Sequence, residues 1–224
     1  MVESVVLLPS VLLGPASLGP LGAELTARGR SVVVADTAGA TTPAEVAARY
    51  RAASPGEPAA WVAHSNAGLY LPALLGERPD DVGVLVDAAL PGPAPAASAA
   101  GERLDALRQL ADPDGLLPAW DAWWGPQRLA ALLPDARHRQ ALAESAPRLP
   151  LSYFTTPVPV PADGGTEARL AWLSFDGPYA SDREAMAAAG RPTRHLPGGH
   201  LSPLTQPARV AAAIEELIGR LRAP

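Results

Sequence analysis

The 224-residue sequence contains no cysteine, and because all 18 of its basic residues are arginine it contains no lysine either. These two absences exclude disulfide bonds, cysteine nucleophiles, zinc ribbons, the P-loop lysine and Schiff-base chemistry. Proton transfer near neutral pH is therefore left to four histidines, 23 aspartates and glutamates, four tyrosines or bound water.

A basic surface for nucleic acid is also missing. The formal net charge is -5, and the arginines are scattered along the chain. No apolar run is long enough to cross a bilayer, and the run Val5–Leu13 follows no basic residue and is interrupted by Pro9, unlike a signal peptide. We therefore expect a cytoplasmic protein with no nucleic-acid partner and no membrane partner, a location with which the absence of cysteine agrees.

Short buried-strand patterns alternate with helical ones, which is typical of a parallel sheet covered by helices on both faces. Six strands are expected, at Ser4–Leu8, Ser31–Ala35, Ala59–Ala63, Val82–Val86, Arg169–Phe175 and Thr193–Leu196. The helices expected between and after them are Ser17–Arg28, Pro43–Ala53, Asn66–Leu75, Ser181–Ala189 and Pro207–Leu221. The predicted fold class is α/β, with a mainly parallel six-stranded sheet.

The alternation stops after the fourth expected strand. Residues 91–161 begin with a linker rich in proline and alanine. Helical patterns follow near Glu102–Leu110, Pro118–Trp124, Gln127–Leu133 and Ala136–Ala146. We predict that this stretch is a small helical lid, inserted into a core formed by residues 1–90 and 162–224.

One serine stands at a turn between an expected strand and an expected helix. The segment from Trp61 to Gly68 reads WVAHSNAG, with Ser65 at the turn. A nucleophile elbow needs small residues two positions before and after its serine, because the strand and the helix pack closely there. Ala63 and Ala67 meet this need, which makes Ser65 a candidate nucleophile. The alternative is that its hydroxyl only caps the following helix.

A candidate base follows much later in the chain. His200 lies in the glycine-rich loop LPGGHLSP between the last expected strand and the last expected helix. The carboxyl ends of parallel strands share one edge of a sheet, so we expect His200 to meet Ser65 there. His64 neighbours the serine and should point away from it. His138 is expected on an exposed lid helix and His195 within the last strand, so both have structural interpretations.

Ser65 in an elbow, His200 in a Gly-Gly-His loop and the expected strand order resemble the α/β-hydrolase superfamily, in particular its compact bacterial members. The resemblance covers nearly the whole chain. One departure is that Pro9-Ser10 replaces the His-Gly that the family has after the corresponding first strand. The resemblance implies a triad of serine, acid and histidine, with no cofactor and no metal.

The acid of such a triad lies between the serine and the histidine in chain order, which leaves two candidates. Asp87 ends the apolar strand Val82–Val86, where a buried carboxylate needs a partner. Asp176 follows the strand Arg169–Phe175, close to the position that most of the family uses. We favour Asp87 and keep Asp176 as the alternative.

The resemblance also implies an oxyanion hole, formed by backbone N–H groups. The expected donors are Asn66, just after the serine, and Val11, in the loop after the first strand. In the lid, Trp120, Trp123 and Trp124 stand at helical spacing. They either form the apolar wall of a substrate pocket or pack the lid onto the core. Further candidates to border the pocket are Tyr153, Phe154 and Tyr179.

These residues predict a serine hydrolase that cleaves a small-molecule ester or thioester with an apolar moiety through an acyl-enzyme on Ser65. One alternative keeps the fold and changes the reaction to that of a lyase, cyclase or acyl transferase, because Pro9-Ser10 alters the oxyanion loop. Another is a catalytically silent binding module. A dinucleotide site is excluded as the main function, because PSVLLGP follows the first strand where G-x-G-x-x-G is needed.

Overall fold

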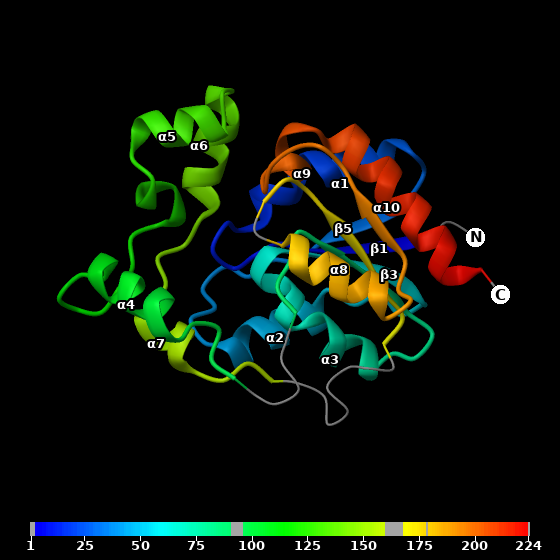
Figure 1. Cartoon of the computed structure of the whole chain (residues 1–224), viewed down its shortest axis with the longest axis horizontal. Helices are drawn as coiled ribbons and strands as arrows, with labels where there is room; N and C mark the ends of the chain where they lie inside the picture. The colour runs from blue at the N-terminus through cyan, green and yellow to red at the C-terminus, as the bar shows by residue number, and fades with distance from the viewer. Residues whose placement is uncertain (1–2, 91–95, 160–167, 178, 224) are drawn as a thin grey trace.

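A computed structural model describes residues 3–90, 96–159, 168–177 and 179–223 of the chain. Its centre is a parallel six-stranded sheet in the order β2-β1-β3-β4-β5-β6 (Figure 1). The strands are β1 (Ser4–Leu8), β2 (Ser31–Val34), β3 (Ala59–His64), β4 (Val82–Val86), β5 (Leu170–Ser174) and β6 (Thr193–His195). The α/β class and the parallel six-stranded sheet predicted from the sequence are confirmed.

The strand order creates one place where a ligand can bind. From β1 the chain crosses to β2 on one side and then returns to β3 on the other side of β1. Loops that leave the carboxyl ends of β1 and β3 therefore diverge, and a crevice opens between them. Ser65 follows β3 directly, so the strand order alone brings it to this crevice.

Both faces of the sheet are covered by helices, because successive strand residues point to opposite faces. On β1, Val6 and Leu8 belong to one buried cluster and Val5 and Leu7 to another. The first cluster packs against α2 (Pro43–Ala52), α3 (Leu71–Gly76) and α8 (Ala180–Ala188), and the second against α1 (Gly19–Ala27) and α10 (Pro207–Arg222). Figure 1 shows these two groups of helices on opposite sides of the strands.

Between β4 and β5 the described chain is mainly helical, and Figure 1 shows this green segment beside the sheet. It contains α4 (Gly101–Leu110), the 3-10 helix η3 (Trp120–Trp123), α5 (Pro126–Leu132), α6 (Ala136–Ser145) and α7 (Leu151–Thr155). We call it the helical segment. A third buried cluster joins it to the core through leucines of both parts: Leu13, Leu133, Leu142, Leu201 and Leu204. The linker expected at residues 91–95 and the boundary at 161 lie outside the described residues.

Several local predictions were wrong. The helix expected at Asn66–Leu75 is divided into the 3-10 helix η2 (Ser65–Leu69) and α3, because Pro72 has no N–H with which to continue the hydrogen bonding. The helix expected at Pro118–Trp124 is only the short η3. Two short helices were not predicted, α7 and α9 (Ser202–Thr205). In the described part of the chain, no helix combines the length and the apolar character needed to span a membrane.

Candidate active site

The backbone at Ser65 is held in an unusual conformation. Its φ of 58° lies in the left-handed region, and among the described non-glycine residues only Asp87 shares a positive φ, at 44°. Two features hold the turn in place. The carbonyl of Ser65 accepts a hydrogen bond of 3.0 Å from the N–H of Ala89, and a side chain at Gly68 would meet the Ala89 carbonyl at 2.3 Å. Backbone strain of this kind is concentrated at functional sites.

Asp87 and His200 are in direct contact. Asp87 follows β4 and is completely buried, and its Oδ2 lies 2.7 Å from His200 Nδ1. Its other carboxylate oxygen accepts a hydrogen bond of 3.4 Å from the N–H of Phe175. An ionised carboxylate can only accept, so Nδ1 of His200 carries the proton in this contact. Nε2 is the ring nitrogen that this contact leaves unused.

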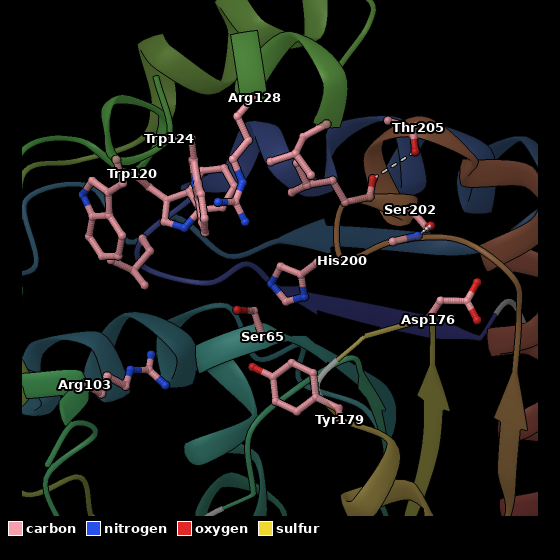
Figure 2. Close-up of a pocket in the computed structure, with 15 residues that line it drawn as sticks. Ser65, Arg103, Trp120, Trp124, Arg128, Asp176, Tyr179, His200, Ser202 and Thr205 are labelled. Atoms are coloured by element: carbon pink, nitrogen blue, oxygen red, sulfur yellow. Dashed lines mark hydrogen bonds between the residues drawn. The ribbon is translucent and has the colours of Figure 1, made fainter. Parts of the chain in front are cut away.

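Ser65 and His200 line the same cavity, which has a volume of about 750 Å³. Figure 2 shows the side chain of Ser65 just below the imidazole of His200, with its hydroxyl to the lower left of the ring. The serine and the histidine are both described residues, and no hydrogen bond joins them. In free enzymes such hydrogen bonds are often long and become short only when substrate binds.

Comparison with known proteins identifies the fold. No protein-family model and no curated protein matches the chain in sequence. An extracellular α/β-hydrolase from a Paenibacillus species matches in structure with a TM-score of 0.74 at 17% identity, over 99% of this chain and all 100% of its own. The chain has the α/β-hydrolase fold.

Two further solved structures have the same fold. Tomato methylketone synthase I complexed with 2-tridecanone matches with a TM-score of 0.73 at 13% identity, over 99% of this chain and 100% of its own. Polyneuridine aldehyde esterase matches with a TM-score of 0.71 at 15% identity, over 97% and 100% of the two chains. The likeness covers the core of the α/β-hydrolase fold and the helical segment together.

Asp176, the alternative acid, contacts a different histidine. Its Oδ1 lies 3.2 Å from Nε2 of His195, and its Oδ2 accepts a hydrogen bond of 3.0 Å from the N–H of Gly198. The side chain of Asp176 is 67% exposed, whereas that of Asp87 is 1% exposed. Of the two carboxylates, only Asp87 is hydrogen-bonded to His200.

The two expected oxyanion donors lie on either side of the crevice of this α/β-hydrolase fold. The residues around Val11 turn tightly, because the carbonyl of Ser10 accepts hydrogen bonds of 3.0 Å from Leu13 and from Gly14. The N–H of Val11 forms no hydrogen bond with the described residues. On the other side, the side chain of Asn66 is held by Tyr153, whose hydroxyl lies 2.7 Å from Asn66 Oδ1.

Two buried tyrosines brace these loops. Tyr50 donates a hydrogen bond of 2.6 Å to the carbonyl of Pro9, next to the turn that contains Val11. Tyr153 lies completely buried on α7 instead of bordering the cavity, and the same correction applies to its neighbour Phe154. Tyr179 does line the cavity, as expected. The sequence contained no signal for the hydroxyl contacts, because they join segments far apart in the chain.

His64 makes a contact that the sequence did not predict. Its Nε2 lies 2.8 Å from the carbonyl oxygen of His200, and the centroids of the two rings are 4.6 Å apart. Burial and the neighbouring His200 lower the pKa of His64 to about 3, so that it is neutral near pH 7. Its Nε2–H therefore donates to the loop of His200. Its Nδ1 is buried and has no hydrogen-bond partner among the residues that the structure describes.

The three lid tryptophans all line the cavity. The rings of Trp120 and Trp124 lie edge to face, with centroids 5.4 Å apart, and Trp123 donates a hydrogen bond of 2.9 Å to the carbonyl of Pro118. Trp120 and Trp123 are only partly buried and also pack against the core cluster. Two of the indoles thus pack against the core cluster while all three line the cavity, and a role in substrate binding stays a prediction.

Proposed function

We propose that the chain is a serine hydrolase that cleaves an ester or thioester with an apolar moiety through an acyl-enzyme on Ser65. The observation that carries the proposal is the 2.7 Å contact between Asp87 and His200 Nδ1, which leaves Nε2 available on the side of Ser65. The strained φ of 58° at Ser65 adds support, because a nucleophile elbow requires such a backbone.

In the proposed reaction, Ser65 Oγ attacks the carbonyl carbon while its proton moves to His200 Nε2. Asp87 accepts the Nδ1–H bond and stabilises the imidazolium. The negative charge that develops on the carbonyl oxygen is stabilised by the N–H groups of Val11 and Asn66. His200 then protonates the leaving alcohol or thiol as its bond to the carbonyl carbon breaks, and the acyl group remains on Ser65. A water, deprotonated by His200, releases the acid.

The surroundings of the site support a small and partly apolar substrate. The indoles of Trp120 and Trp124 offer apolar surface beside Ser65, and the cavity of about 750 Å³ has a size suited to a small molecule. Two of the matching solved structures are named a hydrolase and an esterase, which agrees with ester cleavage. We further propose that the protein acts in the cytoplasm without a nucleic-acid or membrane partner.

A second candidate is a non-hydrolytic reaction on the same residues. Two observations favour it. Pro9 stands in the oxyanion loop at the position where the family commonly has histidine, and one matching solved structure is named a synthase. The two reactions differ in their products. Hydrolysis incorporates one oxygen atom from H₂¹⁸O into the released acid, whereas elimination or acyl transfer to another acceptor does not.

A fluorophosphonate probe tests the proposed nucleophile. The wild-type protein is expected to form one covalent adduct, which peptide mass spectrometry places on Ser65. Ser65→Ala should form none, and His200→Ala should react much more slowly because the serine is no longer deprotonated. Ser152, an exposed serine on α7, provides the matched control, so that Ser152→Ala reacts like the wild type. Equal labelling of Ser65→Ala and the wild type would overturn the proposal.

A further inference from the structure

Two arginines belong to the wall of the cavity that contains Ser65 and His200. Arg103 comes from α4 and Arg128 from α5, so both belong to the helical segment. Figure 2 shows Arg128 extending toward the space above His200 and the guanidinium end of Arg103 on the side that faces Ser65.

Both guanidiniums are without an ion-pair partner among the described residues. No carboxylate in the described part of the chain forms an ion pair with Arg103 or Arg128, whereas Arg108 on the same helix α4 lies 2.7 Å from Asp105. Arg128 stacks on Trp124, with its guanidinium carbon 4.6 Å from the ring centroid. Stacking uses the face of a guanidinium and leaves the N–H groups in its plane free to donate.

The remaining charges around the cavity do not replace such a partner. Asp176 lines the cavity, but its two oxygens contact His195 and Gly198. Asp87 is buried and contacts His200. Two cationic side chains thus line the same cavity as three indoles. A ligand that complements both kinds of side chain is amphiphilic, with an apolar part and an anionic group.

We infer that the substrate carries a carboxylate or phosphate group, which Arg103 and Arg128 bind while its apolar part contacts Trp120 and Trp124. This inference rests on the proposed function, because the position of the anionic group is defined relative to an ester carbonyl at Ser65. Guanidinium groups match carboxylate and phosphate oxygens with paired hydrogen bonds, and such charge-assisted hydrogen bonds are stronger than neutral ones.

Phosphonate inhibitors measure this preference without knowledge of the natural substrate. Three ethyl p-nitrophenyl alkylphosphonates are compared, whose alkyl chains end in a carboxylate, a phosphate or a neutral methyl ester. In each reaction the bond from Ser65 Oγ to phosphorus forms, the bond to p-nitrophenolate breaks, and the serine proton passes to His200. The released p-nitrophenolate gives the second-order rate constant, and mass spectrometry locates the adduct.

With the wild type, we expect at least one of the two anionic inhibitors to react about tenfold faster than the methyl ester. The rates of the two anionic inhibitors show whether the site prefers a carboxylate or a phosphate. Arg103→Gln combined with Arg128→Gln should abolish the advantage, so that the anionic inhibitors react no faster than the methyl ester in this variant. Arg108→Gln, on the same helix α4 but not among the residues that line the cavity, is the matched control and should keep the full advantage. Added salt should reduce the rate advantage of the anionic inhibitors with the wild type, because exposed charges are screened.

Two results would overturn the inference while leaving the proposed function intact. One is that neither anionic inhibitor reacts faster than the methyl ester. The other is that the advantage persists in the double variant. If none of the three inhibitors reacts at Ser65, the proposed function fails, and the inference fails with it.

Discussion

Asp87 is the carboxylate whose replacement should affect catalysis most. Asn in its place keeps the shape but can donate to Nδ1, which favours the wrong tautomer of His200. We expect Asp87→Asn to lower kcat for a p-nitrophenyl ester by about 10³-fold or more, and Asp176→Asn to change it less than about twofold. Steady-state kinetics with both variants decide between the two acids. If Asp176→Asn lost most of its kcat while Asp87→Asn kept full activity, Asp176 and not Asp87 would be the acid of the triad.

His64 should make the protein sensitive to acid. Its pKa is about 3 in the folded chain against an ordinary value of 6.5, so the unfolded chain binds this proton more readily. The contribution of neutral His64 to the free energy of unfolding is fully present above pH 6.5. It is lost as the pH falls toward 3, at up to about 1.4 kcal/mol per pH unit.

Urea unfolding between pH 7 and pH 4 measures this slope. His64→Gln keeps an amide N–H that can reach the carbonyl of His200 but cannot titrate. Its free energy of unfolding should therefore fall less steeply with acid than that of the wild type. Equal slopes for the two proteins would show that His64 does not contribute to the loss of stability in acid. The comparison cancels the carboxylates, which titrate in both proteins.

Among the elements, α7 and η2 are joined through one hydroxyl. Tyr153 OH has a single proton, which it donates to Asn66 Oδ1, so the 2.8 Å contact with Tyr70 is donated by Tyr70. Tyr153→Phe should lower kcat about tenfold with little change in KM, because Asn66 bears a proposed oxyanion donor and loses its support. It should also lower the free energy of unfolding by about 1–3 kcal/mol, because two buried polar groups lose a partner.

Tyr70→Phe is the matched control for this prediction. It removes the bond between the two tyrosines but leaves the bond from Tyr153 to Asn66. Stability should fall while kcat remains close to that of the wild type. Thermal unfolding followed by circular dichroism gives the first quantity, and ester kinetics give the second. Equal losses of kcat in both variants would mean that the tyrosines act only through stability.

The elements also show how far sequence reasoning reaches. The positions of the strands and the candidate role of Ser65 followed from local patterns, since burial, turn residues and small neighbours are encoded within a few residues. The contact of His64 with His200 depends on the path of the loop after β6, which no local pattern encodes. For the same reason the sequence could not decide between Asp87 and Asp176.

For the whole molecule, the attachment of the helical segment to the core is the feature that forms the cavity. Leu142 on α6 is 1% exposed and belongs to the cluster that joins the two parts, whereas Leu132 on α5 is 43% exposed and lines the cavity. Leu142→Ala should lower the free energy of unfolding by about 2–4 kcal/mol. Leu132→Ala should change it by less than about 0.5 kcal/mol and instead raise KM for apolar esters.

Chemical denaturation and ester kinetics on the two leucine variants test whether Leu142 acts in stability and Leu132 in substrate binding. If Leu132→Ala destabilised the protein as much as Leu142→Ala, the exposed leucine would also be part of the attachment. If Leu142→Ala left stability unchanged, the third cluster would not hold the helical segment in place.

The distribution of the five tryptophans has a practical consequence. Trp61 and Trp172 lie in the sheet with 1% and 0% of their surface exposed, while Trp120, Trp123 and Trp124 line the cavity. Indole fluorescence shifts to longer wavelength when water reaches the ring. A ligand in the cavity should therefore change the emission of three indoles and leave that of the other two constant until the core unfolds. Ligand binding and unfolding can thus be followed in one emission spectrum of the unlabelled protein.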